Sequence, residues 1–215
     1  VISRKRGRSG RSLALFFANK HVRNRLLAFV VKAYFGALMV SFARFHYRTV
    51  ADALGRTSHP FGTFDNGYTI LYHSMFLIDA GLAAVGYFCE SALLRNRVRS
   101  VDPYPMSWLV TLACYPPFND ATGTLLPLNM GDQHRLALPL TVLLGLKMVT
   151  IFFFLIYVWA TLALNLKFSN LTNRGIVRGG PYAILRHPAY FGKNMAWWFE
   201  YIPYLKHGAN LLPLI

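Results

Sequence analysis

Acidic residues are scarce in this chain. Only 8 of its 215 residues are Asp or Glu, against 23 Lys or Arg. Charged residues make up 14% of the total, whereas a soluble domain usually carries about 25%. So few carboxylates leave little for catalysis by paired acidic groups. With 54% hydrophobic residues, the balance excludes an ordinary soluble domain and indicates an integral membrane protein.

The chain also lacks the usual patterns of metal sites and activated nucleophiles. Its seven histidines form no HExxH sequence, and neither zinc-finger spacing nor a GxSxG element is present. We therefore predict no metal site. Cys89 and Cys114 are the only cysteines, and they form no CxxC pair and no disulfide framework. Both lie in or beside apolar segments, so we expect reduced thiols that act as small core residues.

Apolar segments dominate the sequence instead, over residues 26–45, 68–89, 108–118 and 136–166. They predict an all-α, multi-spanning helical membrane protein with about four to five transmembrane segments, because about 20 apolar residues cross a bilayer. The last segment contains no turn signal and is expected to form one helix rather than a hairpin. The third ends in Pro116-Pro117, so it either crosses by continuing irregularly to Leu128 or re-enters. Residues 48–66 are expected to form a polar, turn-rich connection.

Positive charge is concentrated in three stretches, residues 1–25, 95–99 and 167–186. Because basic loops stay on the cytosolic side, we expect a cytosolic N-terminus, four crossings, a cytosolic motif loop and then an incomplete fifth segment. Residues 1–25 form a basic tail ahead of a helical membrane domain over residues 26–215. The tail either only sets the topology or also attaches to anionic headgroups or an acidic partner. Membrane lipids, and not nucleic acid, are the predicted partners.

Asp79 lies inside the second apolar segment. A carboxylate within the membrane is a candidate functional residue. The structural alternative is an internal ion pair or hydrogen bond with another helix, and Lys147 is a possible partner. The sequence leaves both interpretations open.

The most informative stretch, residues 175–194, follows the longest apolar segment and is dense in polar and turn-forming residues. Its glycines permit positive φ and a close approach of the backbone to a ligand. Pro188 predicts the start of a helix, because proline is favoured at the first helical position. The free N–H groups at that helix end form an anion site, with Arg186 as a partner for a carboxylate or phosphate.

The helix that begins at Pro188 is expected to carry a polar stripe. The i, i+3, i+4 spacing puts His187, Tyr190, Asn194 and Trp197 on one side. Trp197 also fits the alternative role of a membrane-interface anchor, as does Trp198. We interpret the whole stretch as a cofactor pocket at the cytosolic mouth of the protein. Since carboxylates are few, transfer of an already activated group, which needs little acid or base catalysis from the protein, suits the available side chains.

Gly180-Pro181-Tyr182 followed by Arg186-His187-Pro188-Ala189-Tyr190 resembles the isoprenylcysteine carboxyl methyltransferase family and its phospholipid methyltransferase relatives. The resemblance covers residues 165–198. It implies a membrane-embedded enzyme that uses S-adenosylmethionine and a lipidated or lipid-like acceptor, a carboxylate or a headgroup. By resemblance, the cofactor-binding residues are Gly180, Pro181, Tyr182, His187 and Tyr190, with Arg186 in support. No catalytic residue is assigned.

One part of the family pattern has no counterpart here. The family carries a second motif nearer its C-terminus, with an arginine and glutamates on a cytosolic helix, and nothing after Tyr204 matches it. The chain ends in Leu-Leu-Pro-Leu-Ile, inside a new apolar stretch. We therefore expect that the C-terminal part of the family domain is missing from this sequence.

Two other functions stay open. Arg186-His187-Pro188 with Tyr190-Phe191-Gly192 also resembles the membrane-bound sterol reductases, which use NADPH. The glycine-proline-tyrosine turn ahead of it favours the methyltransferase. In a third interpretation, the chain is a non-catalytic membrane subunit of a larger protein complex.

Overall fold

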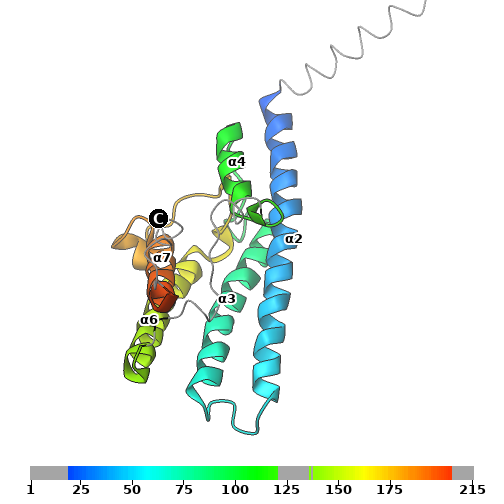
Figure 1. Cartoon of the computed structure of the whole chain (residues 1–215). Coiled ribbons are helices and arrows are strands. Elements are labelled where there is room, and N and C mark those ends of the chain that lie inside the picture. Colours follow the sequence, from blue (N-terminus) through cyan, green and yellow to red (C-terminus); the bar gives the residue numbers. More distant parts are fainter. Residues whose placement is uncertain (1–18, 121–135, 137, 205–215) are drawn as a thin grey trace, which may run out of the picture.

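The computed structural model describes residues 19–120, 136 and 138–204 (Figure 1). This part of the chain is mostly helical, which confirms the all-α prediction. Residues 1–18 of the basic tail and the apolar stretch at 205–215 lie outside the described residues. The elements in chain order are α2 (Lys20–Gly55), α3 (Phe64–Phe88), β1 (Ser100–Val101), α4 (Pro105–Ala113), α6 (Leu140–Leu164), the 3-10 turn η2 (Asn165–Lys167), β2 (Thr172–Asn173), the 3-10 turn η3 (Gly180–Ala183), α7 (Pro188–Tyr201) and the 3-10 turn η4 (Ile202–Tyr204).

Three helices are long and apolar enough to cross a membrane: α2, α3 and the run Leu140–Lys167 formed by α6 and η2. The last of these is one continuous helical run, as expected, and not a hairpin. Within the described residues, the predicted third crossing contains α4, which has nine residues and is too short to span a bilayer by itself. The path toward Leu128 lies outside the described residues, so the count of four to five crossings stays a prediction.

The connection between α2 and α3 is shorter than predicted. Residues 48–55 were expected in a polar loop but continue α2 as far as Gly55, because no proline interrupts the helix before that glycine. The loop covers only residues 56–63. Asn66 closes it, since its side-chain amide donates to the carbonyl oxygens of Ala53 at 3.0 Å and of Pro60 at 2.7 Å.

The helix directions are set by contacts at both ends of the bundle. Near the N-terminal ends of α3 and α6, Lys147 Nζ lies 2.7 Å from Asp65 Oδ1. Near their C-terminal ends, Arg174 donates to the carbonyl oxygens of Gly86 and Leu166. Therefore α3 and α6 run parallel, and α2 runs antiparallel to both (Figure 1). The chain between α3 and α6 must return from one end of the bundle to the other.

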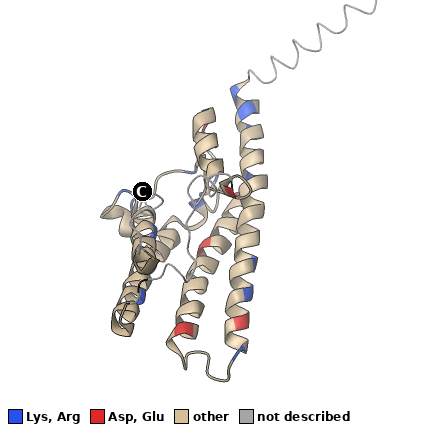
Figure 2. Ribbon diagram, viewed as in Figure 1, with Lys and Arg blue, Asp and Glu red and all other residues tan. Residues whose placement is uncertain are grey.

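Charged residues are few along α3 and α6, whereas α2 carries several, most of them toward its two ends (Figure 2). Apolar packing joins the elements through two buried clusters. One holds α2, α3 and β1 together around Phe35 and Tyr87. The other joins α3, α6 and α7 around Phe154 and Ala196. Cys89 and Cys114 are free thiols, as expected, but both are exposed, so the prediction that they are core residues is wrong. Each is the residue that directly follows the end of its helix.

Candidate functional site

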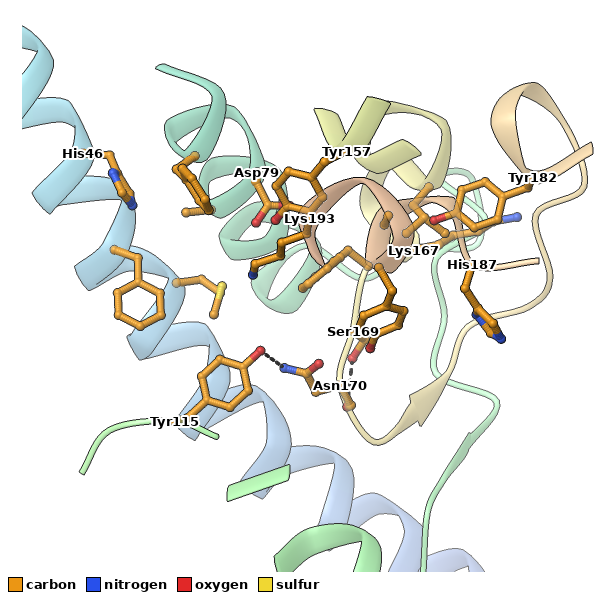
Figure 3. A pocket seen from close by; sticks show the side chains of 18 of the residues that line it. His46, Asp79, Tyr115, Tyr157, Lys167, Ser169, Asn170, Tyr182, His187 and Lys193 are labelled. Atoms are coloured by element: carbon orange, nitrogen blue, oxygen red, sulfur yellow. Dashed lines mark hydrogen bonds between the residues drawn. The ribbon is translucent and has the colours of Figure 1, made fainter. Parts of the chain in front are cut away.

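A cavity of about 630 Å³ lies between α2, α3, α6, α7 and the segment that joins α6 to α7 (Figure 3). Its size falls within the range of about 300–1,000 Å³ that is typical of small-molecule sites. Apolar atoms make up most of the exposed wall, although more than half of the lining residues carry a polar group. The polar members are His46, Asp79, Tyr115, Tyr157, Lys167, Ser169, Asn170, Tyr182, His187, Tyr190 and Lys193.

Three of the six predicted cofactor-binding residues line this cavity: Tyr182, His187 and Tyr190. The rings of His187 and Tyr190 meet edge to face, with centroids 6.1 Å apart. Burial, with a smaller contribution from Tyr190, raises the pKa of the Tyr182 phenol to about 12, so this hydroxyl stays protonated at neutral pH. The helix start is confirmed, because Pro188 is the first residue of α7 and Phe191 N donates to His187 O.

The other three predicted residues do not line the cavity. Gly180 has φ +61° and faces Ala163 of α6, so its role in the structure is the tight turn that enters η3. Pro181 is buried within that turn. Arg186 is exposed. Their assignment as cofactor-binding residues remains a prediction from the resemblance alone.

The face of α7 that meets the cavity differs from the predicted stripe. Ala189, Tyr190 and Lys193 line the wall, whereas Asn194 is exposed. The Lys193 ammonium lies over aromatic rings, 4.7 Å from the centroid of Trp197 and 5.5 Å from that of Tyr157. Trp197 packs against the buried cluster of α3 and α6 rather than standing free at an interface. An ionisable residue in an apolar helix is the signal that could have identified Lys193 beforehand.

Asp79 is one of the few buried charged residues, with 8% of its surface exposed. Its Oδ1 accepts a hydrogen bond from Thr161 Oγ1 of α6 at 3.0 Å. The Tyr157 hydroxyl lies against the same carboxylate. Lys147 is not its partner, contrary to one predicted option, because that lysine pairs with Asp65 near the start of α3. The interhelical hydrogen bond and the position on the cavity wall occur together, so the two interpretations of Asp79 are not exclusive.

The wall between α2 and the motif loop comes from parts of the chain that carried little sequence signal. Tyr115, just after α4, accepts a hydrogen bond from Asn170 Nδ2 at 3.1 Å. Its own hydroxyl proton is thus available to the cavity. Asn170 N in turn donates to Tyr87 Oη at 2.8 Å. The stretch around Tyr115 and the loop after α6 are distant in sequence, and only their packing brings them to one wall.

A buried arginine fixes the start of the motif loop. Arg174 is 3% exposed, and its Nη1 donates to the carbonyl oxygens of Gly86 at 2.5 Å and Asn96 at 3.2 Å. Its guanidinium lies over the Tyr87 ring at 5.7 Å. The antiparallel pairing of β1 with β2 also holds this loop, because Thr172 and Asn173 come directly before Arg174. The motif loop is therefore anchored at the bundle end where α3 and α6 finish.

Among the described residues, no group of three or more His, Cys, Asp or Glu side chains could hold a metal ion. Comparisons with protein-family models, with curated proteins and with solved structures find no match to this chain. The motif and the geometry of the cavity are therefore the features that indicate a function.

Proposed function

We propose that this protein is a membrane-embedded methyltransferase that uses S-adenosylmethionine and a lipidated or lipid-like acceptor. One observation carries the proposal: Tyr182, His187 and Tyr190 of the motif share a cavity with charged and hydroxyl groups of the apolar helices. A polar cofactor and an apolar acceptor need both kinds of contact in one site, and this cavity offers polar groups beside apolar surface.

The residues of the chain suit binding, orientation and exclusion of water. When bound, S-adenosylmethionine supplies a methyl group: the acceptor's lone pair bonds to the methyl carbon, while the electrons of the broken carbon–sulfur bond stay on sulfur. The aromatic side chains of Tyr115 and Tyr182 line the cavity, and aromatic rings stabilise a cation such as a sulfonium. Phe42 and Phe76 add apolar surface to the wall of the cavity. Positioning in a water-poor site lowers the barrier without a strong protein base.

The proposed topology has four crossings, with the N-terminus and the motif loop on the cytosolic side. Because α3 and α6 are parallel, the chain between them must traverse the bundle once, and this supports a third crossing between Phe88 and Leu140. The start of α2, residues 95–99 and the loop around Arg174 lie at the same bundle end (Figure 1), which supports a common basic side. Anionic headgroups remain the proposed partners of the basic tail.

A sterol-type reductase that uses NADPH is the competing enzyme. NADPH carries a 2′-phosphate, which an arginine commonly accommodates. No arginine is among the described residues that line the cavity, and Arg186 is exposed outside its wall. The chemistry of the wall therefore favours S-adenosylmethionine over NADPH.

A direct binding measurement tests the proposal. The chain in lipid nanodiscs is titrated calorimetrically with S-adenosylhomocysteine and, separately, with NADPH. Binding of the first ligand alone is the expected result. Binding of NADPH alone would establish the reductase. Binding of neither ligand, together with co-purification in a larger complex, would establish a non-catalytic membrane subunit.

A further inference from the structure

Asp79 of α3 and Lys193 of α7 place opposite charges on one wall of the cavity (Figure 3). Asp79 is buried and Lys193 is partly buried. The two charges attract each other. Yet, within the described part of the chain, the ion pairs formed are Lys32 with Glu90 and Lys147 with Asp65, and neither Asp79 nor Lys193 takes part in one.

Such a pair of separated charges is costly in an apolar bundle unless something complements it. Thr161 donates to Oδ1 of Asp79, and the Tyr157 hydroxyl lies against the same carboxylate, which leaves part of its acceptor capacity unused. Lys193 has ring faces around its ammonium, at 4.7 Å from Trp197 and 5.9 Å from Phe76, and ring faces accept no conventional hydrogen bond. Both charged groups thus keep hydrogen-bonding capacity toward the cavity.

The complementary ligand group has a positive and a negative charge a few bonds apart. An α-amino acid has this form: its ammonium pairs with a carboxylate and its carboxylate with an ammonium. We infer that Asp79 binds the α-ammonium, and Lys193 the α-carboxylate, of the methionine end of S-adenosylmethionine. This inference rests on the proposed function and names the residues that hold one end of its cofactor.

The position of the two charges agrees with the rest of the cavity. Tyr182 and His187 lie on the side of the motif loop, while Asp79 and Lys193 lie on the side of the long helices (Figure 3). An extended cofactor with its amino-acid end between Asp79 and Lys193 leaves the motif-loop side for its adenosine. In this arrangement Lys193 binds the cofactor carboxylate, a role that was predicted for Arg186 from the sequence. Arg186 is exposed and does not line the cavity.

Ligand truncation tests the inference without altering the protein. Wild-type chain in nanodiscs is titrated with S-adenosylhomocysteine and with 5′-methylthioadenosine, which lacks the amino-acid end. Each lost charge-assisted contact weakens binding by about tenfold or more. S-adenosylhomocysteine should therefore bind at least tenfold more tightly. Equal affinity for the two ligands overturns the inference and leaves the proposed function standing. Binding of neither ligand overturns both.

Variants then assign the residues. Asp79→Asn, Lys193→Met and the charge-balanced double variant should each lose affinity for S-adenosylhomocysteine about tenfold or more, with 5′-methylthioadenosine unchanged. The double variant keeps the test valid if one unpaired charge prevents folding, because it removes both charges together. Lys147→Met is the matched control, since Lys147 pairs with Asp65 outside the cavity. An equal loss for both ligands, or no loss for either, contradicts the assignment.

Discussion

Gly192 of α7 lies directly against the main chain of α6 at Phe153. A Cβ atom placed on Gly192 would lie 2.8 Å from the Phe153 carbonyl oxygen and 2.8 Å from the Tyr157 amide nitrogen. Both neighbours are backbone atoms of a regular helix, so they cannot move aside as a flexible side chain would. The glycine that follows the RHPxYF sequence thus serves the close packing of two helices, and this packing holds Tyr190 and Lys193 on the cavity wall.

Gly192→Ala should therefore destabilise the protein by about 1–3 kcal/mol, the usual cost of overpacking a tight contact. The measurement is the thermal unfolding midpoint in detergent. Gly145→Ala is the control: Gly145 lies within α6 with nothing within 4 Å of its Cβ position, and alanine favours a helix. A midpoint for Gly192→Ala equal to that of wild type would contradict the close approach.

Arg174→Met should cost about 3 kcal/mol or more of stability. The change removes charge-assisted hydrogen bonds to the carbonyl oxygens of Gly86, Asn96 and Leu166 at a site that is 3% exposed. Chemical denaturation followed by tryptophan fluorescence measures the loss. Arg178→Met removes an exposed arginine from the same loop and should leave stability unchanged. Equal effects of the two substitutions would show that Arg174 does not anchor the loop.

Glu90 should make stability depend on pH on the acidic side. Burial by itself raises the pKa of this carboxyl, but hydrogen bonds from Lys32 and the Val98 amide, with the charges of Lys32 and Arg174, outweigh it and hold the pKa below its ordinary value of 4.5. A carboxyl with a lowered pKa stabilises the folded state above its unfolded value, and the contribution disappears as the pH falls through the folded value.

Glu90→Gln should accordingly lower stability by about 1 kcal/mol at pH 7, and this difference from wild type should shrink once the pH falls below 4.5. Thermal midpoints of both proteins between pH 7 and pH 3.5 test it. Asp52→Asn is the control. It alters an exposed carboxylate of α2 and should give a difference from wild type that is small at every pH. A pH-independent difference for Glu90→Gln would contradict the lowered pKa.

His187→Ala and Tyr190→Phe should weaken the binding of S-adenosylhomocysteine without unfolding the protein. Both side chains are exposed at the cavity wall, so the substitutions lose little packing. Each substitution removes one hydrogen-bonding group, which should lower the affinity by a factor of about 3 to 10. Calorimetric titration measures the affinity and a thermal scan the stability. His59→Ala and Tyr104→Phe alter exposed residues outside the cavity and serve as controls. Unchanged affinity in both site variants would remove these residues from the cofactor site.

The helix pattern follows from local properties, and most of it could be predicted. Runs of about 20 apolar residues predict spanning helices, and Pro188 marks the start of α7 because proline fits the first helical turn. The prediction was wrong at the end of the first long helix. Residues 48–55 mix polar and apolar side chains and are helical, since nothing before Gly55 interrupts the backbone hydrogen bonds of α2.

The site itself could be predicted only in part. The motif identified Tyr182, His187 and Tyr190 as a group because they are close in sequence. Lys193 lies close to the motif in sequence, but only the packing of α7 shows that it faces the cavity. Tyr115 reaches the cavity because the segment just after α4 packs against the loop that follows α6.

Composition and apolar periodicity alone determined that this chain forms long membrane-type helices with basic residues between them, because burial in lipid depends on each segment by itself. Only the tertiary structure decided that Asp79 meets Thr161 rather than Lys147, and that it shares a wall with Lys193. Such contacts depend on the direction, rotation and spacing of neighbouring helices. The packing of side chains such as Phe154, and the close approach at Gly192, set these relations.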